Sequence, residues 1–288
     1  MCTEKLITME NTSKRIFLVP TDFSEVCNNA MKQAAIAASE MGAKVYLLHI
    51  INTDTRNYLR KENLATSSLD DKLNAMVEDL KKEYGIEAAY KIKEGSIFTD
   101  IAEIAEELNA ALIFLGTHGK TGMQHLTGSF AIKVITSAHM PTIVVQERPF
   151  NHAPKHIVLP VTSEAGPMEK TRHAAMIANA FNATIHIYQI GASEEQVSKA
   201  VSIMSEFFDK NNVAYDIKVA TAGNFSKQVI DFAVAKNADM ILIMTNPDKN
   251  LTKFILGSYD EDMIFNVPQI PVMCVNPRKK EWEKLRLL

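Results

Sequence analysis

The chain carries one pattern twice, and this internal repeat restricts its fold more than any other feature. Ala174–Ala178 matches Ala34–Ala38 at an offset of 140, and Pro271 matches Pro141 at an offset of 130. Each copy has the size of a whole domain. The sequence therefore predicts two similar domains in tandem. Their expected bounds are a flexible tail at residues 1–13, a first domain at 14–150 and a second domain at 151–288.

The apolar runs are short and continuous, which is typical of strands that are buried on both faces of a parallel sheet. The expected strands cover residues 16–20, 44–50, 88–93, 111–115 and 141–146, then 157–160, 184–190, 240–244 and 270–275. The helices expected in the first copy cover residues 30–41, 67–84, 99–108 and 130–135. Residues 52–66 are polar, and are expected to form a loop or an irregular helix that the second copy lacks. Strands that alternate with helices predict the α/β class.

Composition and charge restrict the partners and the compartment. The chain has 288 residues, a net charge of −3 and scattered lysines and arginines, which argues against a nucleic-acid partner. Its start lacks the apolar region of a signal peptide, and it has no run of about 18 apolar residues to span a membrane. The three cysteines form no CxxC pair and are expected to be inert thiols in a reducing compartment. These features predict a cytoplasmic protein.

A glycine-rich stretch from Gly116 to Ser129 follows the expected strand 111–115. Glycine lets the backbone approach a ligand closely, so that several N–H groups converge on an anion. Ser129 has the character of a helix N-cap, which would direct free N–H groups to the same place. The pattern indicates a phosphate-binding loop. A plain strand-to-helix connection is the alternative that the spacing leaves open.

Three segments in order resemble the universal stress protein family. They are Pro20–Ser24, which reads PTDFS, the pair His49 and Ile50, and the glycines of Gly116–Ser129. The resemblance covers two such domains in tandem and is more specific in the first. It implies two open five-stranded parallel sheets of the adenine-nucleotide α-hydrolase type, which is Rossmann-like, with a ligand at the carboxyl edge of the strands.

The resemblance also implies which residues of the first domain hold a nucleotide. The expected ligand is ATP, and the presence of Mg²⁺ with it is left open. Asp22 would contact the adenosine end, and Ile50 would meet the adenine through its main chain. The ribose and phosphates would be held by Gly116, Gly119, Gly128 and Ser129, with Phe130 contributing at most an N–H group.

Two departures from the family pattern bear on this site. Nucleotide-binding members place nine residues between the second glycine and the Gly-Ser pair, whereas Lys120–Thr127 supplies eight. One residue fewer shortens the reach of the loop by up to about 3.5 Å. In the second copy Met244–Pro247 lacks both glycines, and Pro247 has no N–H group to offer. We therefore expect the second domain not to bind ATP in the family manner.

Simpler interpretations stand beside these functional ones. Asp22 suits an Asx turn. His118 and His125 are expected to be solvated loop residues, and Lys120 is equally consistent with a phosphate contact and with solvation. The sequence has no Walker loop, no metal-ligand spacing, no GxSxG motif and no visible acid/base pair. It therefore predicts no catalytic residue.

The favoured hypothesis is a stress-response protein that binds an adenine nucleotide and acts in regulation rather than in catalysis. One rival is an interaction module in which neither domain binds nucleotide. A slow ATPase or a phosphotransfer enzyme is a third hypothesis. The last strands, at Thr142–Gln146 and Val272–Asn276, are expected to pair within the chain as a pseudo-dimer, because this pairing covers two open sheet edges. Pairing of two chains in a homodimer is left open.

Overall fold

The computed structural model describes residues 14–118, 128–149, 151–161, 167–190, 195–220, 223–245 and 258–276. The N-terminal half contains β1 (Ile16–Pro20), α1 (Glu25–Met41), β2 (Lys44–Ile51), α2 (Thr53–Lys61), α3 (Ser67–Tyr84), β3 (Glu87–Glu94), α4 (Asp100–Glu107), β4 (Leu112–Gly116), α5 (Gly128–Ser137) and β5 (Thr142–Val145). The C-terminal half contains β6 (His156–Val161), α6 (Pro167–Phe181), β7 (Thr184–Ile190), α7 (Glu195–Lys210), β8 (Tyr215–Ala220), α8 (Phe225–Ala235), β9 (Met240–Met244), α9 (Ser258–Ile264) and β10 (Val272–Val275).

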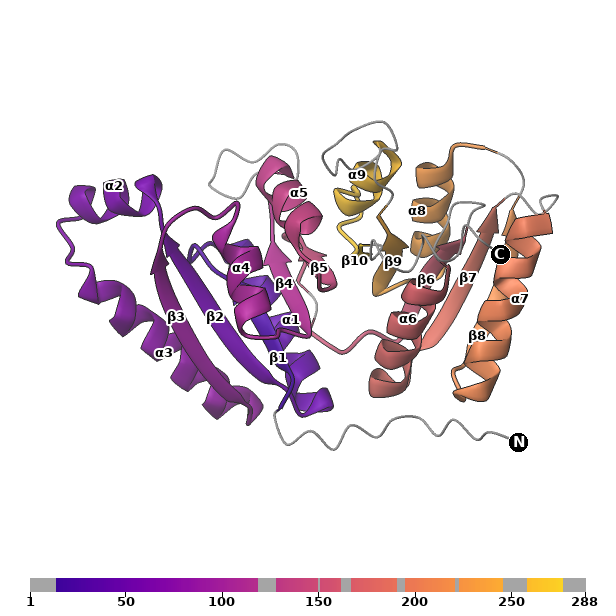
Figure 1. The fold of residues 1–288 in the computed structure, drawn as a ribbon, viewed down its shortest axis with the longest axis horizontal. Helices are drawn as coiled ribbons and strands as arrows, with labels where there is room; N and C mark the ends of the chain where they lie inside the picture. The colour runs from indigo at the N-terminus through magenta and orange to yellow at the C-terminus, as the bar shows by residue number, and fades with distance from the viewer. Residues whose placement is uncertain are drawn as a thin grey trace.

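The strands form one ten-stranded sheet in the order β3-β2-β1-β4-β5-β10-β9-β6-β7-β8. Neighbouring strands are parallel within each half, and the two halves meet where β5 and β10 pair antiparallel (Figure 1). Val272 lies opposite Val144 in that pair, and Cys274 lies opposite Thr142. The α/β class and the predicted pairing of the last strands inside one chain are therefore confirmed.

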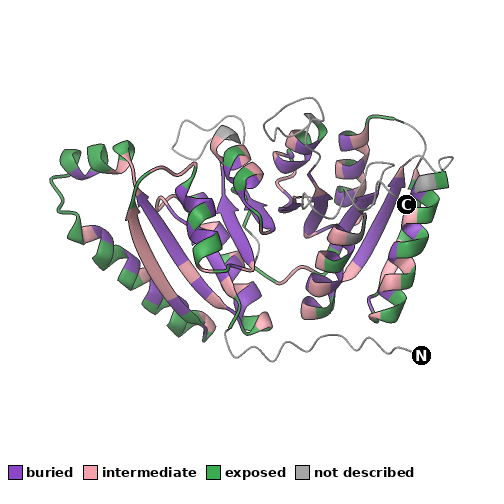
Figure 2. Cartoon of the chain, in the orientation of Figure 1, coloured by how far each residue is buried: buried purple, intermediate pink, exposed green. Residues whose placement is uncertain are grey.

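Helices cover both faces of the sheet and create two apolar layers. Phe17 and Val19 of β1 face a layer built with α1, α3, α6 and α7, whereas Leu18 between them faces a layer built with α4, α5, α8 and α9. Figure 2 shows the central strands buried, with the exposed residues on the outer surfaces of the helices. Burial on both faces is the physical reason that these strands read as continuous apolar runs.

Local sequence determines where several of the helices begin and end. Gly42 and Gly85 adopt left-handed φ values of 61° and 65° and end α1 and α3 as expected. The expected loop or irregular helix at 52–66 contains the regular helix α2, because the Asn52 side chain accepts a hydrogen bond from the Thr55 N–H at 2.9 Å. Helix α5 starts at Gly128, so Ser129 lies inside its first turn rather than at the predicted N-cap position.

Two side-chain amides fasten the halves together in a reciprocal manner. Gln146 follows β5, and its Nε2 donates to the carbonyls of Ile264 and Asn266 at the end of α9, at 3.4 and 3.2 Å. Asn276 follows β10, and its Nδ2 donates to two carbonyls at the end of α5, those of Ile135 and Ala138, at 2.6 and 2.7 Å. Each half therefore caps a helix of the other. None of the described helices is long and apolar enough to cross a membrane.

Candidate functional site

A cavity of about 420 Å³ lies at the carboxyl ends of β1 and β2. Its walls come from the turn Pro20–Ser24, the end of β2, the start of α2 and the helices α3 and α4. In the strand order the reversal lies between β1 and β4, so the cavity adjoins the switch point on its β1 side. Crevices at such switch points are where open α/β sheets bind ligands.

The turn after β1 places Asp22 in the wall of this cavity. Asp22 Oδ1 accepts a hydrogen bond from the Ser24 N–H at 2.9 Å, and Thr21 Oγ1 accepts one from the Phe23 N–H at 3.0 Å. Phe23 has a φ of 68°, which is uncommon for a residue with a bulky side chain. The Asx turn is therefore formed, and it holds the Asp22 carboxylate in the cavity wall, whereas contact between Asp22 and a ligand stays a prediction.

His49 forms part of the cavity lining and is only 3% exposed. Its Nδ1 lies 2.8 Å from the Thr21 carbonyl oxygen, so this nitrogen carries a proton and donates. The imidazole stacks on the Phe23 ring, with the ring centroids 4.6 Å apart, and the Lys72 ammonium lies 4.2 Å from the Phe23 centroid. Burial lowers the pKa of His49 below its ordinary value, so the ring is neutral near pH 7.

Ile50, the second predicted contact, lies beside His49 at the end of β2 and is buried. Its carbonyl oxygen accepts a hydrogen bond from Thr55 Oγ1 at 3.3 Å, which ties the start of α2 to the strand end. The same hydroxyl lies 3.4 Å from His49 Nε2. The structure thus brings Asp22 and Ile50 to one cavity, as the sequence predicted. It also adds Phe23 and His49, which belong to the quoted motifs but had no predicted role, and Lys72, which lies in no motif.

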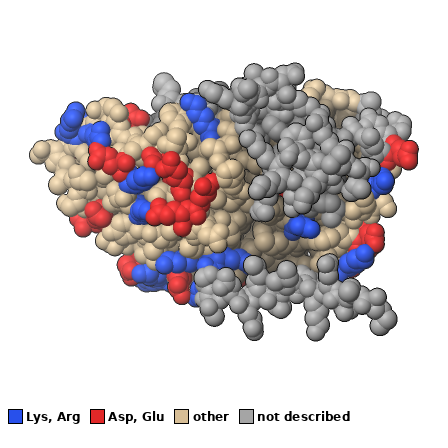
Figure 3. Space-filling view, in the orientation of Figure 1, with Lys and Arg blue, Asp and Glu red and all other residues tan. Residues whose placement is uncertain are grey.

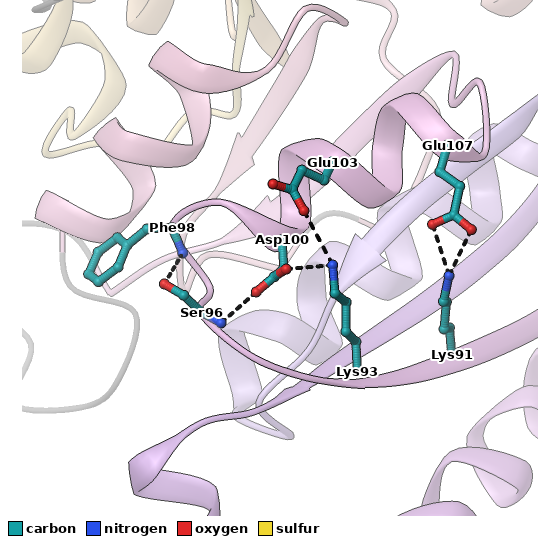
Figure 4. A network of polar contacts seen from close by, with 7 residues as sticks. All are labelled: Lys91, Lys93, Ser96, Phe98, Asp100, Glu103 and Glu107. Atoms are coloured by element: carbon teal, nitrogen blue, oxygen red, sulfur yellow. Dashed lines mark hydrogen bonds and ion pairs between the residues drawn. The ribbon is translucent and has the colours of Figure 1, made fainter.

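The opposite wall of the cavity includes Ile97 and Ile101, and a polar network positions them. Asp100 accepts hydrogen bonds from the Ser96 N–H and from Lys93 Nζ, both at 2.5 Å (Figure 4). The Lys93 ammonium holds the pKa of Asp100 below its ordinary value. Further pairs between lysines of β3 and glutamates of α4 give the mixed charge visible over this part of the surface in Figure 3. The network fixes the turn that joins β3 to α4.

Gly116 ends β4 and packs against the first turn of α1. A Cβ atom at this position would lie 2.5 Å from the Val26 carbonyl oxygen and 2.7 Å from the Cys27 nitrogen. Only glycine lets the end of β4 lie this close to the backbone of α1. Gly116 is not among the residues that line the cavity. Close helix packing therefore explains this glycine without a ligand.

The remaining predicted residues lie beyond β4. Gly119 falls outside the described residues, as do His125 and Lys120. Gly128 and Ser129 begin α5, and the Phe130 ring stacks on Phe98 with a centroid distance of 4.8 Å. The convergence of the Gly119, Ser129 and Phe130 N–H groups on one anion stays a prediction.

His118 differs from its expected solvated state. Its side chain is 16% exposed, and its Nδ1 lies 3.4 Å from Glu147 Oε1. The prediction was wrong because His118 directly follows the buried Thr117, whose N–H donates to the Val145 carbonyl and so continues the pairing of β4 with β5. Among the described residues, no group of three or more histidine, cysteine, aspartate or glutamate side chains is arranged to hold a metal ion.

The C-terminal half contains a buried cation near the carboxyl end of β6. Lys170 of α6 donates from Nζ to the Pro160 carbonyl oxygen at 2.5 Å. Burial lowers the pKa of Lys170 to about 8, although the nearby Asp260 opposes that shift. The counterpart of Gly116 is Met244, the last residue of β9, whereas the counterparts of Asp22 and Gly119 lie outside the described residues. The predicted loss of ATP binding in this half therefore stays a prediction.

The lowered pKa of Lys170 predicts that the free energy of unfolding depends on pH. Between pH 8 and 10.5 the unfolded chain holds the Lys170 proton and the folded chain does not, so the wild type gains stability as pH rises. Lys170→Met lacks this gain. The unfolding free energy of the variant relative to wild type should therefore fall by roughly 3 kcal/mol over this interval. Urea unfolding of both proteins at several pH values measures the difference, and parallel pH curves would contradict the assignment.

The fold and the site define an α/β protein of the open-sheet type, with its crevice at the switch point of the N-terminal half. The universal stress protein family model matches residues 14–146. A universal stress protein of Methanocaldococcus jannaschii is 35% identical over 145 residues, which cover 48% of this chain and 85% of that protein. The chain belongs to the universal stress protein family.

Two further comparisons extend this result. A second universal stress protein of Methanocaldococcus jannaschii is 28% identical over 155 residues, covering 46% of this chain and 94% of that protein. The crystal structure of a universal stress protein from Archaeoglobus fulgidus matches with a TM-score of 0.71 and 17% identity, covering 91% of this chain and 98% of that one. At this identity the match concerns the fold alone, and it includes both halves.

Proposed function

We propose that the N-terminal half binds one adenine nucleotide, in the form of ATP, and that the protein acts in a stress response as a nucleotide-responsive regulator. The observation that carries the proposal is the cavity of about 420 Å³ that brings Asp22 and Ile50 together at the switch point of the sheet. Its volume lies in the range of about 300–1,000 Å³ that is usual for small-molecule sites.

The cavity has the chemistry that a nucleoside requires. Ile50, Ile97 and Ile101 provide apolar walls against which a planar base packs. The Asp22 carboxylate offers acceptor oxygens to hydroxyl groups of a ribose, and its turn holds it in place. Lys72 also lines the cavity and supplies a positive charge. The main-chain groups at the end of β2 lie within the same wall.

The phosphates would extend from the cavity toward the start of α5. A helix N-terminus presents free N–H groups and the positive end of its dipole, which suits an anion. Helix α5 begins at Gly128, within the last two residues of the glycine-rich stretch. Mg²⁺ bound to ATP would be held mainly by the phosphates, as is usual for this ion.

Regulation is favoured over catalysis because of how the described residues hold His49. The titratable bases in the cavity lining include His49, Asp22 and Asp54. The Nδ1 of His49 is committed to the Thr21 carbonyl oxygen, and Asp22 Oδ1 accepts a hydrogen bond from the Ser24 N–H. A general base must be within reach of the proton that it removes and free to accept it. A ring that is 3% exposed and held through Nδ1 has little access to a water molecule, so we expect at most slow hydrolysis.

Substitution of Asp22 tests the site. Asp22→Asn keeps the acceptor for the Ser24 N–H but removes the charge, so ATP should bind about tenfold more weakly while the fold keeps its stability. Asp22→Ala should weaken binding and also destabilise the entry into α1. Isothermal titration calorimetry and urea unfolding separate the two effects. Asp231→Asn, which removes an exposed carboxylate of α8, is the matched control.

The eight-residue segment Lys120–Thr127 favours the alternative of an interaction module without nucleotide. The same calorimetry decides between the two. If the native protein binds no ATP and releases no adenine nucleotide after acid quenching, the interaction module is correct and the nucleotide site is not.

A further inference from the structure

The two ends of the ten-stranded sheet differ in how their edges are protected. β3 and β8 lie at opposite ends of the strand order (Figure 1). An open edge strand attracts other strands unless charges, coverage or distortion prevent it. The exposed large apolar side chains include Ile217 and Val219 of β8, which are 44% and 50% exposed. No β3 residue is among them in the described part of the chain.

β3 carries the charges that prevent pairing. Glu87 forms an ion pair with Lys14, Lys91 with Glu107 and Lys93 with Asp100. Glu94, the last residue of the strand, pairs with Arg56. These four charged side chains occupy both ends and the middle of β3, whereas β8 carries only two, those of Asp216 and Lys218. Within the described part of the chain the β3 edge is therefore the better protected one, and β8 pairs with no strand other than β7.

The backbone of β8 presents its hydrogen-bonding groups to that open side. The Ala214 carbonyl accepts a hydrogen bond from the Ile185 N–H of β7 at 2.9 Å. Backbone groups of successive residues in a strand point to alternate sides, so those of Tyr215, Ile217 and Val219 point away from β7. These are the residues whose N–H and C=O groups would form a new antiparallel ladder.

We propose that β8 pairs antiparallel with β8 of a second copy of this chain, with Ile217 opposite Ile217 of that copy. In this register Asp216 lies opposite Lys218 of the second copy, and Lys218 lies opposite its Asp216. Tyr215 lies opposite Val219, and each Ala214 lies opposite Ala220. Opposite charges and aromatic–β-branched pairs are the cross-strand pairs that stabilise antiparallel sheets. The short strand is thus complementary to itself in both charge and shape.

Other registers lack this complementarity. A shift that centres the pair on Asp216 places two carboxylates opposite each other, and one centred on Lys218 places two ammonium groups opposite each other. A shift by one residue places charged side chains opposite apolar ones. It also turns every side chain of the second strand to the other face of the sheet. Asp216 is charged in the folded chain, because hydrogen bonds from Lys236 and His186 outweigh the effect of burial and lower its pKa.

Sedimentation equilibrium of the full chain tests the proposal. The weight-average mass should rise with concentration from the 32.1 kDa of one chain toward twice that value. Lys218→Glu places a carboxylate opposite Asp216 and should abolish the rise. Lys91→Glu on the protected β3 edge is the matched control and should leave it unchanged. A constant single-chain mass up to several hundred micromolar, or a dimer that Lys218→Glu does not weaken, would overturn the proposal.

Single cysteines test the register independently of stability. In a Cys2→Ser background, Ile217→Cys should give disulfide-linked dimers under mild oxidation. Residues directly opposite in an antiparallel pair have Cα atoms about 5.5 Å apart, which a disulfide can span. Val219→Cys is equally exposed but should not cross-link, because Tyr215 lies opposite it. Cross-linking of Val219→Cys without cross-linking of Ile217→Cys would refute this register.

Discussion

Gly116→Ala should lower the free energy of unfolding by about 3 kcal/mol, one of the two largest effects that we expect. The new Cβ would lie 2.5 Å from the Val26 carbonyl oxygen, and backbone atoms of a helix cannot move aside as a flexible side chain can. Overpacking of a buried site costs about 1–3 kcal/mol, and this contact lies at the upper end. Urea unfolding monitored by circular dichroism measures the loss.

Gly85→Ala is the matched control for this substitution. Gly85 has a left-handed φ of 65°, but a Cβ there would meet no atom within 4 Å. Its replacement should cost about 1 kcal/mol, from backbone conformation alone. If the two variants lose equal stability, the close contact between β4 and α1 is not the reason for a glycine at position 116, and a role in ligand binding becomes the better explanation.

The second large effect concerns the junction between the halves. Asn276→Leu should destabilise the chain by about 3 kcal/mol, because two carbonyls at the end of α5 lose the amide donor that joins them to the other half. Gln146→Leu removes the corresponding cap of α9, whose hydrogen bonds are longer, and should cost about half as much. Thermal and urea unfolding of the single variants give both values.

Asn211→Leu provides the comparison outside the junction. Asn211 Nδ2 donates to the Phe207 carbonyl at 2.7 Å within the same half, near the end of α7. Its loss should cost about 1 kcal/mol, because the Phe207 carbonyl keeps the hydrogen bond from the Asn211 N–H. If Asn276→Leu loses no more stability than Asn211→Leu, the amide of Asn276 does not hold the halves together.

The sequence predicted the strands better than the helix starts. β7 and β9 have the predicted bounds, because continuous apolar runs between polar turns mark a strand buried on both faces. Helix α1 starts at Glu25 instead of residue 30, since the turn made by Asp22 positions Ser24 ahead of the helix. The single sheet follows from pairing between strands that are far apart in the chain, which the repeat indicated and the β5–β10 register confirmed.

The site was predictable only where a motif carried it. Asp22 and Ile50 follow neighbouring strands, and parallel strands place their carboxyl ends at one edge. The stacking of Phe23 on His49, with Lys72 above it, depends on a helix that lies about fifty residues away in sequence, and no local pattern encodes such contacts. Gly116 shows that a glycine in a binding motif also satisfies a packing requirement, so its ligand contact stays a prediction.

The most direct test of the central claim is the number of ATP molecules bound per chain. Isothermal titration calorimetry of the full chain with ATP and Mg²⁺ should give one site per chain. Binding should weaken in Asp22→Asn and stay unchanged in Asp231→Asn. Two sites per chain would show that the C-terminal half also binds, and no binding heat, or binding that ignores Asp22, would contradict a nucleotide site at the ends of β1 and β2.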